Sequence, residues 1–258
     1  MKLTLVHLYP KLLNIYGDYG NIIALKYRAE KRGIKLTVRP VEVGEPLKNG
    51  SFELLFAGGG QDQQQVTASR DLQKKKMVLR AASDAGVPML TICGSFQLFG
   101  DFFKPFAGPK LKGVGLLPAY TVADKVRKIG NLVIKLNPSL RSTIDNLKSD
   151  LLVGFENHSG NTWLKDKSSA LGKVVIGHGN NGKDHTEGCR INNVFGCYLH
   201  GSLLPKNPHF ADHLIKLALT NKYGPVKLKP LNDRLEWQAH RQAVARAKKL
   251  AHPLLKYI

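Results

Sequence analysis

The chain has 258 residues, of which 43% are hydrophobic and 22% are charged, so it is long enough for one large globular domain or two small ones. This composition excludes a disordered, collagen-like or coiled-coil protein. The net charge of +20, from 39 basic and 19 acidic residues, favours a polyanion as partner: a nucleic acid, an anionic membrane surface or a phosphate-bearing substrate.

The N-terminal third alternates between strand and helix patterns. We expect strands at Lys2–His7, Lys35–Val41, Phe52–Ala57 and Val87–Ile92, and helices at Asn21–Arg32 and Asp71–Ala85, the second capped by Asp71. Gly33 and Gly86 follow the two helices, as glycine often does just beyond a helix end. The alternation predicts an α/β fold with a mostly parallel sheet and helices on both of its faces.

The rest of the chain is richer in strand patterns, followed by helices. We expect strands at Leu132–Leu136, Leu151–Phe155, Lys173–Ile176 and Val194–Leu199, and a helix at His209–Leu219. Tyr223-Gly224-Pro225 interrupts the pattern, and 232–250 favours a basic helix that contains Trp237. We therefore expect one α/β domain over residues 1–220 and a basic helical C-terminal extension over residues 221–258.

Cys93 stands between an apolar strand and a run that can start a helix, Gly94-Ser95-Phe96-Gln97. A nucleophile on such a sharp turn projects from the carboxyl edge of the sheet. The free N–H groups and the dipole of the helix N-terminus favour the thiolate, which is the reactive form. Cys93 is therefore a candidate nucleophile, and Gly94 can offer its N–H to a developing oxyanion. The alternative is a buried, unreactive cysteine.

A general base and a second oxyanion donor are expected at the same edge. His200 ends a predicted strand, and an imidazole there could take the thiol proton and later protonate a leaving group. Gly58-Gly59-Gly60 follows another strand and could direct a backbone N–H toward the same place. Taken singly, His200 could be a histidine with a structural role and the glycines a plain tight turn.

Together these residues resemble the class I glutamine amidotransferases of the cobyric acid synthase-like branch, over most of residues 1–220. The resemblance is carried by three motifs, 56–62 (FAGGGQD), 93–100 (CGSFQLFG) and 198–201 (YLHG). It implies a flavodoxin-like α/β fold. It also implies an enzyme in which the cysteine attacks the glutamine side-chain amide, ammonia leaves, and a thioester is hydrolysed.

Further segments resemble one family within that branch, the glutaminase subunits of lipid II isoglutaminyl synthase. They are 8–10 with 14–18, 154–160, 179–182 and 203–208. The resemblance implies a heterodimer with a Mur-ligase-like subunit that uses ATP and Mg²⁺, so that no cofactor belongs to this chain. That partner activates the α-carboxyl of D-glutamate in lipid II, and ammonia converts it to D-isoglutamine during peptidoglycan biosynthesis.

The resemblance also assigns roles to individual residues. They are Cys93 as nucleophile, His200 as base, Gly59, Gly60 and Gly94 at the oxyanion hole, and Gln97 and Arg127 at the substrate glutamine. A guanidinium suits a carboxylate because its fork matches two oxygens. The neighbouring Lys128 is the alternative to Arg127 for that role.

The sequence departs from the family pattern beside the base. Many class I amidotransferases carry His-Pro-Glu, whose glutamate orients the histidine, whereas this chain reads His200-Gly201-Ser202. Loss of the orienting acid in a serine triad costs about 10⁴ in turnover. Either a dyad works alone or an acid comes from elsewhere, and the resemblance implies that the partner subunit supplies it, so that full activity requires the complex.

Three further patterns are weaker. Residues 177–184 approach a phosphate-binding loop, but Asp184 replaces the Ser or Thr that would hold Mg²⁺, and Asn-Gly favours a turn. Cys189, Cys197, His178 and His185 match no paired-ligand spacing for zinc, so we expect no metal site. Glu156-Asn157-His158 lies in a family motif without an assignable chemical role.

Three cysteines are too few and odd in number for a disulfide framework, and no signal peptide or transmembrane run is evident. We expect a cytoplasmic protein, whose charge would suit a peripheral approach to the anionic inner membrane face. Nucleic-acid binding is disfavoured because no dense Lys/Arg run is present. Two alternatives stay open: ammonia delivery to another carboxylate, such as a corrinoid, and an inert amidotransferase-like scaffold.

Overall fold

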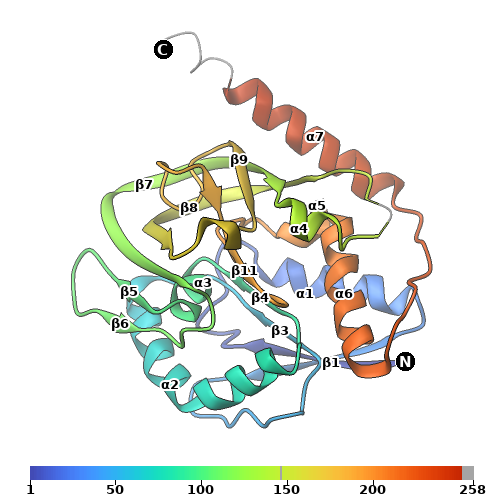
Figure 1. The fold of residues 1–258 in the computed structure, drawn as a ribbon, viewed down its shortest axis with the longest axis horizontal. Helices are drawn as coiled ribbons and strands as arrows, with labels where there is room; N and C mark the ends of the chain where they lie inside the picture. Colours follow the sequence, from blue (N-terminus) through green and yellow to red (C-terminus); the bar gives the residue numbers. More distant parts are fainter. Residues whose placement is uncertain (146, 252–258) are drawn as a thin grey trace.

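A computed structural model describes residues 1–145 and 147–251 and contains two β-sheets with flanking helices (Figure 1). The first sheet has the order β11-β12-β4-β3-β1-β2. Its strands are β1 (Lys2–Leu8), β2 (Lys35–Val41), β3 (Leu54–Ala57), β4 (Met89–Ile92), β11 (Cys189–Ile191) and β12 (Val194–Cys197). All neighbours are parallel except the β11–β12 pair. The order of the five parallel strands is that of flavodoxin-like folds.

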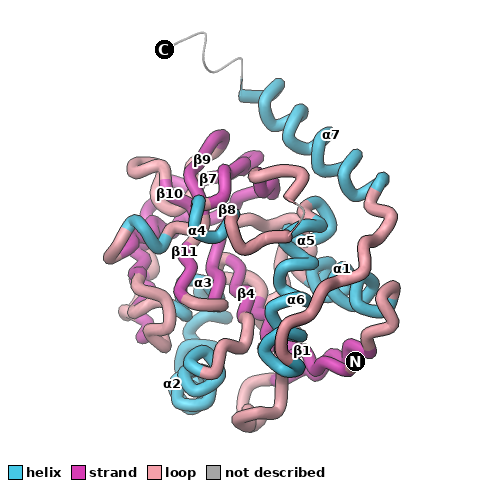
Figure 2. The backbone as a smooth tube through the Cα atoms, turned by 45° about the vertical axis from the view of Figure 1, so that its right-hand side comes forward, coloured by secondary structure: helices cyan, strands magenta, loops and turns pink. Residues whose placement is uncertain are grey.

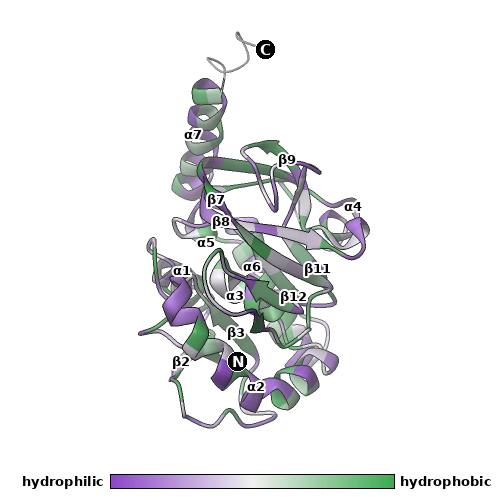
Figure 3. Cartoon of the chain, turned by 90° about the vertical axis from the view of Figure 1, so that its left-hand side faces the viewer, coloured by the Kyte–Doolittle hydropathy of each residue, from purple (hydrophilic) through white to green (hydrophobic). Residues whose placement is uncertain are grey.

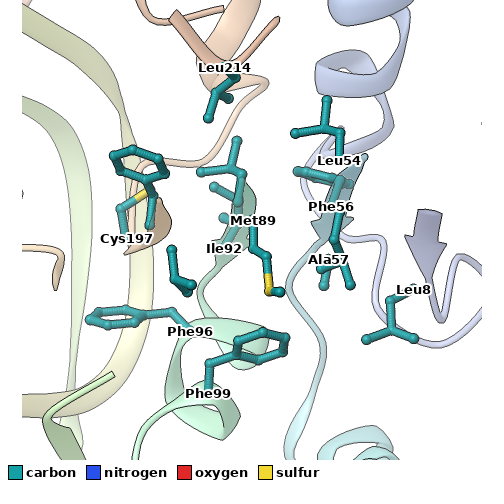
Figure 4. Packing of buried hydrophobic residues seen from close by; sticks show 14 of the residues in the cluster. Leu8, Leu54, Phe56, Ala57, Met89, Ile92, Phe96, Phe99, Cys197 and Leu214 are labelled. Carbon is teal, nitrogen blue, oxygen red and sulfur yellow. The ribbon is translucent and has the colours of Figure 1, made fainter. Parts of the chain in front are cut away.

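Helices cover both faces of this sheet, as predicted. They are α1 (Tyr19–Glu30), α2 (Asp62–Asp84), α3 (Gly94–Phe99), α5 (Leu203–Lys206) and α6 (Pro208–Tyr223). Figure 1 shows α2 on one side of the sheet and α1 with α6 on the other, and Figure 2 shows the same arrangement from a second direction. Strands β3 and β4 are entirely buried, and their apolar side chains form the centre of the core (Figure 4). The predicted fold class is confirmed.

The second sheet is mostly antiparallel and is larger than predicted. It contains β5 (Phe102–Lys104), β6 (Leu111–Lys112), β7 (Ala119–Leu136), β8 (Leu151–Leu164), β9 (Gly172–Ile176) and β10 (Thr186–Glu187), with helix α4 (Pro138–Arg141) and a 3-10 turn at Lys167–Ser169 beside it. Only one end of β7 and of β8 was predicted. The polar, charged residues of 120–131 and the irregular pairing between Ala123 and Lys128 hide the strand period in the sequence.

Helix α2 begins at Asp62, well before the predicted cap at Asp71, so that prediction is wrong. Gln61 and Gln64 form a reciprocal capping box, because each side chain bonds the other residue's backbone N–H. Asp71 instead lies inside the helix, where its carboxylate accepts a hydrogen bond from Tyr9 at 2.7 Å and pairs with Lys75. The buried ion pair explains why an acidic residue occupies this position.

The C-terminal helix α7 (Arg234–Ala251) packs against the second sheet and α5. Val244 and Ala247 contact Val133 and Val153, and Trp237 is buried. Figure 3 shows polar and apolar residues interleaved along this helix, which fits a helix with one packed face. Residues 252–258 of the predicted extension lie outside the described residues. No helix in the described part of the chain is long and apolar enough to span a membrane.

Candidate active site

Cys93 lies on a strained turn where β4 ends and α3 begins. Its backbone has φ +52° and ψ −107°, an unfavourable conformation for a residue with a Cβ. Its N–H donates to the carbonyl of Cys197 at the end of β12 (2.8 Å), and the Ser95 hydroxyl donates to the carbonyl of Gly58 after β3. The turn is therefore fastened to both neighbouring strands, and it presents Cys93 at their carboxyl edge.

His200 is positioned by both sheets. It follows β12, and its backbone exchanges two hydrogen bonds with Phe155 of β8, at 2.8 and 3.1 Å. The imidazole has no exposed surface, and the edge of Tyr16 lies against it with ring centroids 5.1 Å apart. Nδ1 lies 3.2 Å from an oxygen of Asp18, while Nε2 has no oxygen or nitrogen partner among the described residues. The second nitrogen is thus available to the Cys93 thiol.

The surroundings of His200 favour its charged form. Burial lowers the pKa of the imidazole, but the neighbouring Cys93 and the carboxylate of Asp18 outweigh it and raise that pKa to about 10. An imidazolium in this buried place can stabilise negative charge that forms on the Cys93 sulfur. The geometry therefore places a proton-carrying imidazole beside the Cys93 thiol.

Asp18 is the functional residue that sequence reasoning missed. It follows β1, has no exposed surface, and holds His200 with one carboxylate oxygen. The other oxygen accepts the N–H of Gly59 at 2.7 Å. The acid absent from the His200 motif is thus present within the chain, and alignment of the imidazole does not require a carboxylate from a partner. A useful signal was available, since Asp18, like Cys93 and His200, follows a parallel strand.

The oxyanion donors differ from those predicted in one respect. The N–H of Gly59 donates to Asp18 and is therefore not free to stabilise an oxyanion. Gly59 instead lets the backbone pass close to His200 and Cys93. A Cβ on Gly59 would lie 2.7 Å from Cε1 of His200 and 3.3 Å from Cβ of Cys93. The backbone of Gly60 lies close to that of Gly94, as the distance of 3.1 Å from a Cβ built on Gly94 to the nitrogen of Gly60 indicates. Their two N–H groups are the remaining candidates.

A cavity of about 460 Å³ opens beside Cys93. Gly60 and Gln97 line it, together with Arg127 and Asn157 from β7 and β8. The structure thus brings Cys93, His200, Gly60, Gly94, Gln97 and Arg127 to one edge of the parallel sheet. Their chemical roles stay predictions.

Arg127, rather than Lys128, faces this cavity. Strand alternation turns the two side chains to opposite faces of β7, and Lys128 is buried with its ammonium 2.8 Å from Oδ1 of Asn161. The Arg127 guanidinium is exposed and donates from Nε and Nη2 to Oδ1 of Asn157, at 3.1 and 2.7 Å. The remaining donors of the guanidinium can meet a carboxylate entering the cavity.

Gln97 is oriented by a buried network on the floor of the cavity. Its amide nitrogen donates to the Tyr198 hydroxyl at 3.1 Å, and no described residue bonds its carbonyl oxygen. The ring of His158 stacks on Tyr198 with centroids 3.6 Å apart. Burial lowers the pKa of His158, so that ring is neutral. The network leaves one acceptor, the oxygen of Gln97, for a bound molecule.

Glu156, which carried no assignable role, is a structural residue. Its carboxylate accepts the backbone N–H groups of His178 and Gly179, at 2.7 and 2.9 Å, and it has no exposed surface. It therefore anchors residues 177–184, where Oδ1 of Asn181 accepts the N–H groups of Lys183 and Asp184. The predicted turn in this segment is confirmed.

Comparison with known proteins adds to this geometry. Residues 4–208 match the CobB/CobQ-like glutamine amidotransferase domain. The chain is 37% identical, over 95% of its length and 96% of the relative's, to the Lipid II isoglutaminyl synthase (glutamine-hydrolyzing) subunit GatD of Staphylococcus aureus. It is 40% identical to the subunit of the same name from Streptococcus pneumoniae, over 86% and 83% of the two chains.

More distant relatives share part of the sequence or the fold alone. A cobyric acid synthase of Caldanaerobacter subterraneus is 25% identical over 66% of this chain, but over only 33% of its own length. The PurLQS structure from Thermotoga maritima has a TM-score of 0.56 at 17% identity, covering 85% of this chain and 99% of that one. The glutaminase domain of Trypanosoma brucei CTPS, solved with bound acivicin, has a TM-score of 0.52 at 12% identity, covering 88% and 96%.

Proposed function

Because this chain belongs to the CobB/CobQ-like glutamine amidotransferase family, and is similar to GatD subunits over nearly its whole length, we propose that it is the glutaminase subunit of a lipid II isoglutaminyl synthase. The single observation that supports the catalytic part is the grouping of Cys93, His200 and Asp18 around Gly59, beside a cavity of about 460 Å³.

In the proposed first step, glutamine enters the cavity with its α-carboxylate at Arg127 and its side-chain amide at Cys93. The thiolate attacks the amide carbon, and the N–H groups of Gly60 and Gly94 stabilise the oxyanion. The His200 imidazolium then gives its proton to the leaving nitrogen, the C–N bond breaks, and ammonia departs. A thioester with Cys93 remains.

In the second step, water hydrolyses that thioester. His200, now neutral, accepts a proton from the attacking water, and the same two N–H groups stabilise the second oxyanion. Collapse expels the Cys93 thiolate and releases glutamate. Asp18 holds the imidazole through Nδ1 in both steps, so that Nε2 stays directed at the reacting atoms.

The ammonia acceptor lies outside this chain. We propose a Mur-ligase-like subunit that supplies ATP and Mg²⁺ and activates the α-carboxyl of D-glutamate in lipid II. Identities of 37% and 40% to GatD subunits over most of both chains favour this acceptor. The match to a cobyric acid synthase covers a third of that protein, which makes a corrinoid acceptor the weaker alternative.

The test is covalent labelling by a diazo-ketone glutamine analogue, read by intact-protein and peptide mass spectrometry. A single adduct on Cys93 is expected, because that thiol alone lies beside His200 and the cavity. Cys93→Ala should abolish the adduct. Cys189→Ser is the matched control, because Cys189 is also buried, and burial raises its pKa to about 11.

Labelling is repeated with a Mur-ligase-like subunit and ATP. In a parallel reaction that contains glutamine in place of the analogue, D-isoglutamine is measured in lipid II. A Cys93 adduct together with amidated lipid II supports both halves of the proposal. An adduct without amidation, when the partner is active with free ammonia, removes the lipid II acceptor only. No adduct on folded protein in either condition contradicts the glutaminase itself.

A further inference from the structure

A second cavity, also of about 460 Å³, lies between helix α6 and residues 227–233, which lead to α7. It shares no lining residue with the cavity at Cys93. Basic side chains dominate its charged lining, which includes Arg32, Lys148, Lys216, Lys227 and Lys229. Leu228, Pro230 and Trp237 add an apolar wall. The proposed glutaminase chemistry makes no use of this cavity.

His213 of α6 lines this cavity as a buried polar group without a partner. Its side chain is 3% exposed, and neither ring nitrogen bonds to any residue that the structure describes. Burial, with smaller contributions from Arg190 and Lys216, lowers the pKa of the ring to about 4 despite the opposing effect of Asp145. A neutral imidazole keeps one N–H donor and one acceptor nitrogen. Buried groups of this kind normally have a hydrogen-bond partner.

The charge at this cavity is unbalanced. Arg32 pairs with Asp212, and Lys216 pairs with Asp145. Asp212 is bound a second time by the buried guanidinium of Arg28, which also binds Asp233. Lys148, Lys227 and Lys229 make no ion pair within the described part of the chain. Positive charge is therefore left over for a ligand.

A metal ion is the other ligand that a histidine pair would suggest. His209 and His213 stand one helical turn apart and both line the cavity. The described residues, however, contain no group of three or more His, Cys, Asp or Glu side chains suited to a metal. Surrounding cations would also repel one. The charge and the donors both fit an anion better.

We propose that this cavity binds a small organic phosphate. Lys148, Lys227 and Lys229 would neutralise its charge, and the N–H of His213 would donate to a phosphate oxygen. The apolar wall at Trp237 and Leu228 would cover the organic part of the ligand. The proposal is independent of the glutaminase function, because the two cavities are separate.

The test is titration of the full chain with phenyl phosphate by calorimetry, and by NMR of the histidine ring nitrogens. We expect saturable binding that shifts the His213 resonances, with inorganic phosphate as a competitor. The double variant K227A/K229A should weaken binding about tenfold, through the loss of two charge contacts. The double variant K48A/K74A removes the same charge from exposed sites outside the cavity and should change affinity less than about twofold.

Cys93 labelling should be unchanged in both lysine variants, which shows that they are folded and that the two sites are independent. Absence of binding, or equal weakening in the two double variants, would overturn the proposal. Unmoved His213 resonances would overturn it as well. So would competition by phenol but not by phosphate, because the apolar wall alone would then hold the probe. Tight binding of Zn²⁺ that shifts His209 and His213 would assign the cavity to a metal instead.

Discussion

Asp18 and His200 are 182 positions apart in the chain, yet they meet in a hydrogen bond of 3.2 Å from which solvent is excluded. The second oxygen of the same carboxylate accepts the N–H of Gly59 at 2.7 Å. One side chain thus fixes both the base and the glycine turn that lies against Cys93. The two positions belong to loops after β1 and β12, which the sheet brings to one edge.

Asp18→Asn should separate the effect of Asp18 on His200 from its contact with the Gly59 turn. The amide keeps the shape of the carboxylate but loses the charge that helps to raise the pKa of His200, so that pKa should fall below its wild-type value of about 10. Turnover of glutamine should fall by up to about 10⁴-fold, as when a serine triad loses its acid. Histidine NMR titration and steady-state kinetics measure the two effects.

The control for this variant is Asp62→Asn, an exposed carboxylate on the rim of the same cavity. It should leave both the pKa of His200 and turnover close to wild type. If Asp18→Asn loses activity while the pKa of His200 stays near 10, then Asp18 acts through the Gly59 turn and not through the base.

Arg127→Ala should raise the KM for glutamine and leave kcat nearly unchanged, because the proposed contact of the guanidinium is with a part of the substrate that does not react. Loss of a charged hydrogen bond predicts an increase in KM of about 10–100-fold. Arg127→Lys should recover part of the loss, since an ammonium keeps the charge without the fork. Lys125→Ala is the control, because it removes one positive charge from an exposed position on the same strand. Its KM should stay close to the wild-type value. A fall in kcat alone would contradict substrate binding by Arg127.

Glu187 predicts an unusual dependence of stability on pH. Burial raises the pKa of its carboxyl from 4.5 to about 8, against the opposing backbone hydrogen bond from Tyr198. The folded protein therefore favours the neutral carboxyl of Glu187. The stability that the protein has with this neutral carboxyl is fully present below pH 4.5 and is lost as pH rises toward 8. Glu187→Gln should remove this fall in stability with rising pH, because an amide does not ionise. The difference in Tm between variant and wild type should grow from about pH 5 to pH 8, and a constant difference would refute the assignment.

Arg28 should be a major determinant of stability. Its guanidinium is 3% exposed and bonds Asp212 of α6 and Asp233 before α7, with four contacts of 2.6–2.8 Å. Arg28→Met leaves these two acids without that partner and should lower the free energy of unfolding by about 3–5 kcal/mol in urea denaturation. Lys26→Ala removes only an exposed pair with Glu30 and should change it by less than about 0.5 kcal/mol. Equal effects would show that Arg28 is not specifically required.

Positions that depend on a single general rule of the fold could be predicted from the sequence. Cys93 and His200 were placed correctly, since parallel strands all end at one edge of their sheet. Asp18 was missed because, although it too follows a parallel strand, its contact depends on which loops the sheet brings together. Asp71 was wrongly predicted as a helix cap, because an acidic residue before a helical pattern is typical of a helix start. In the structure the same carboxylate is inside the helix and forms a buried ion pair with Lys75.

The distance along the chain between Asp18 and His200 has a consequence for synthesis. At about 5–20 residues per second, roughly 10–40 s separate the emergence of the two residues from the ribosome. For the part of that interval after Cys93 has emerged, a nascent chain carries this residue without His200. The arrangement of Cys93, His200 and Asp18 is therefore complete only after the last parallel strand has joined the sheet, so that unfinished chains lack the proposed site.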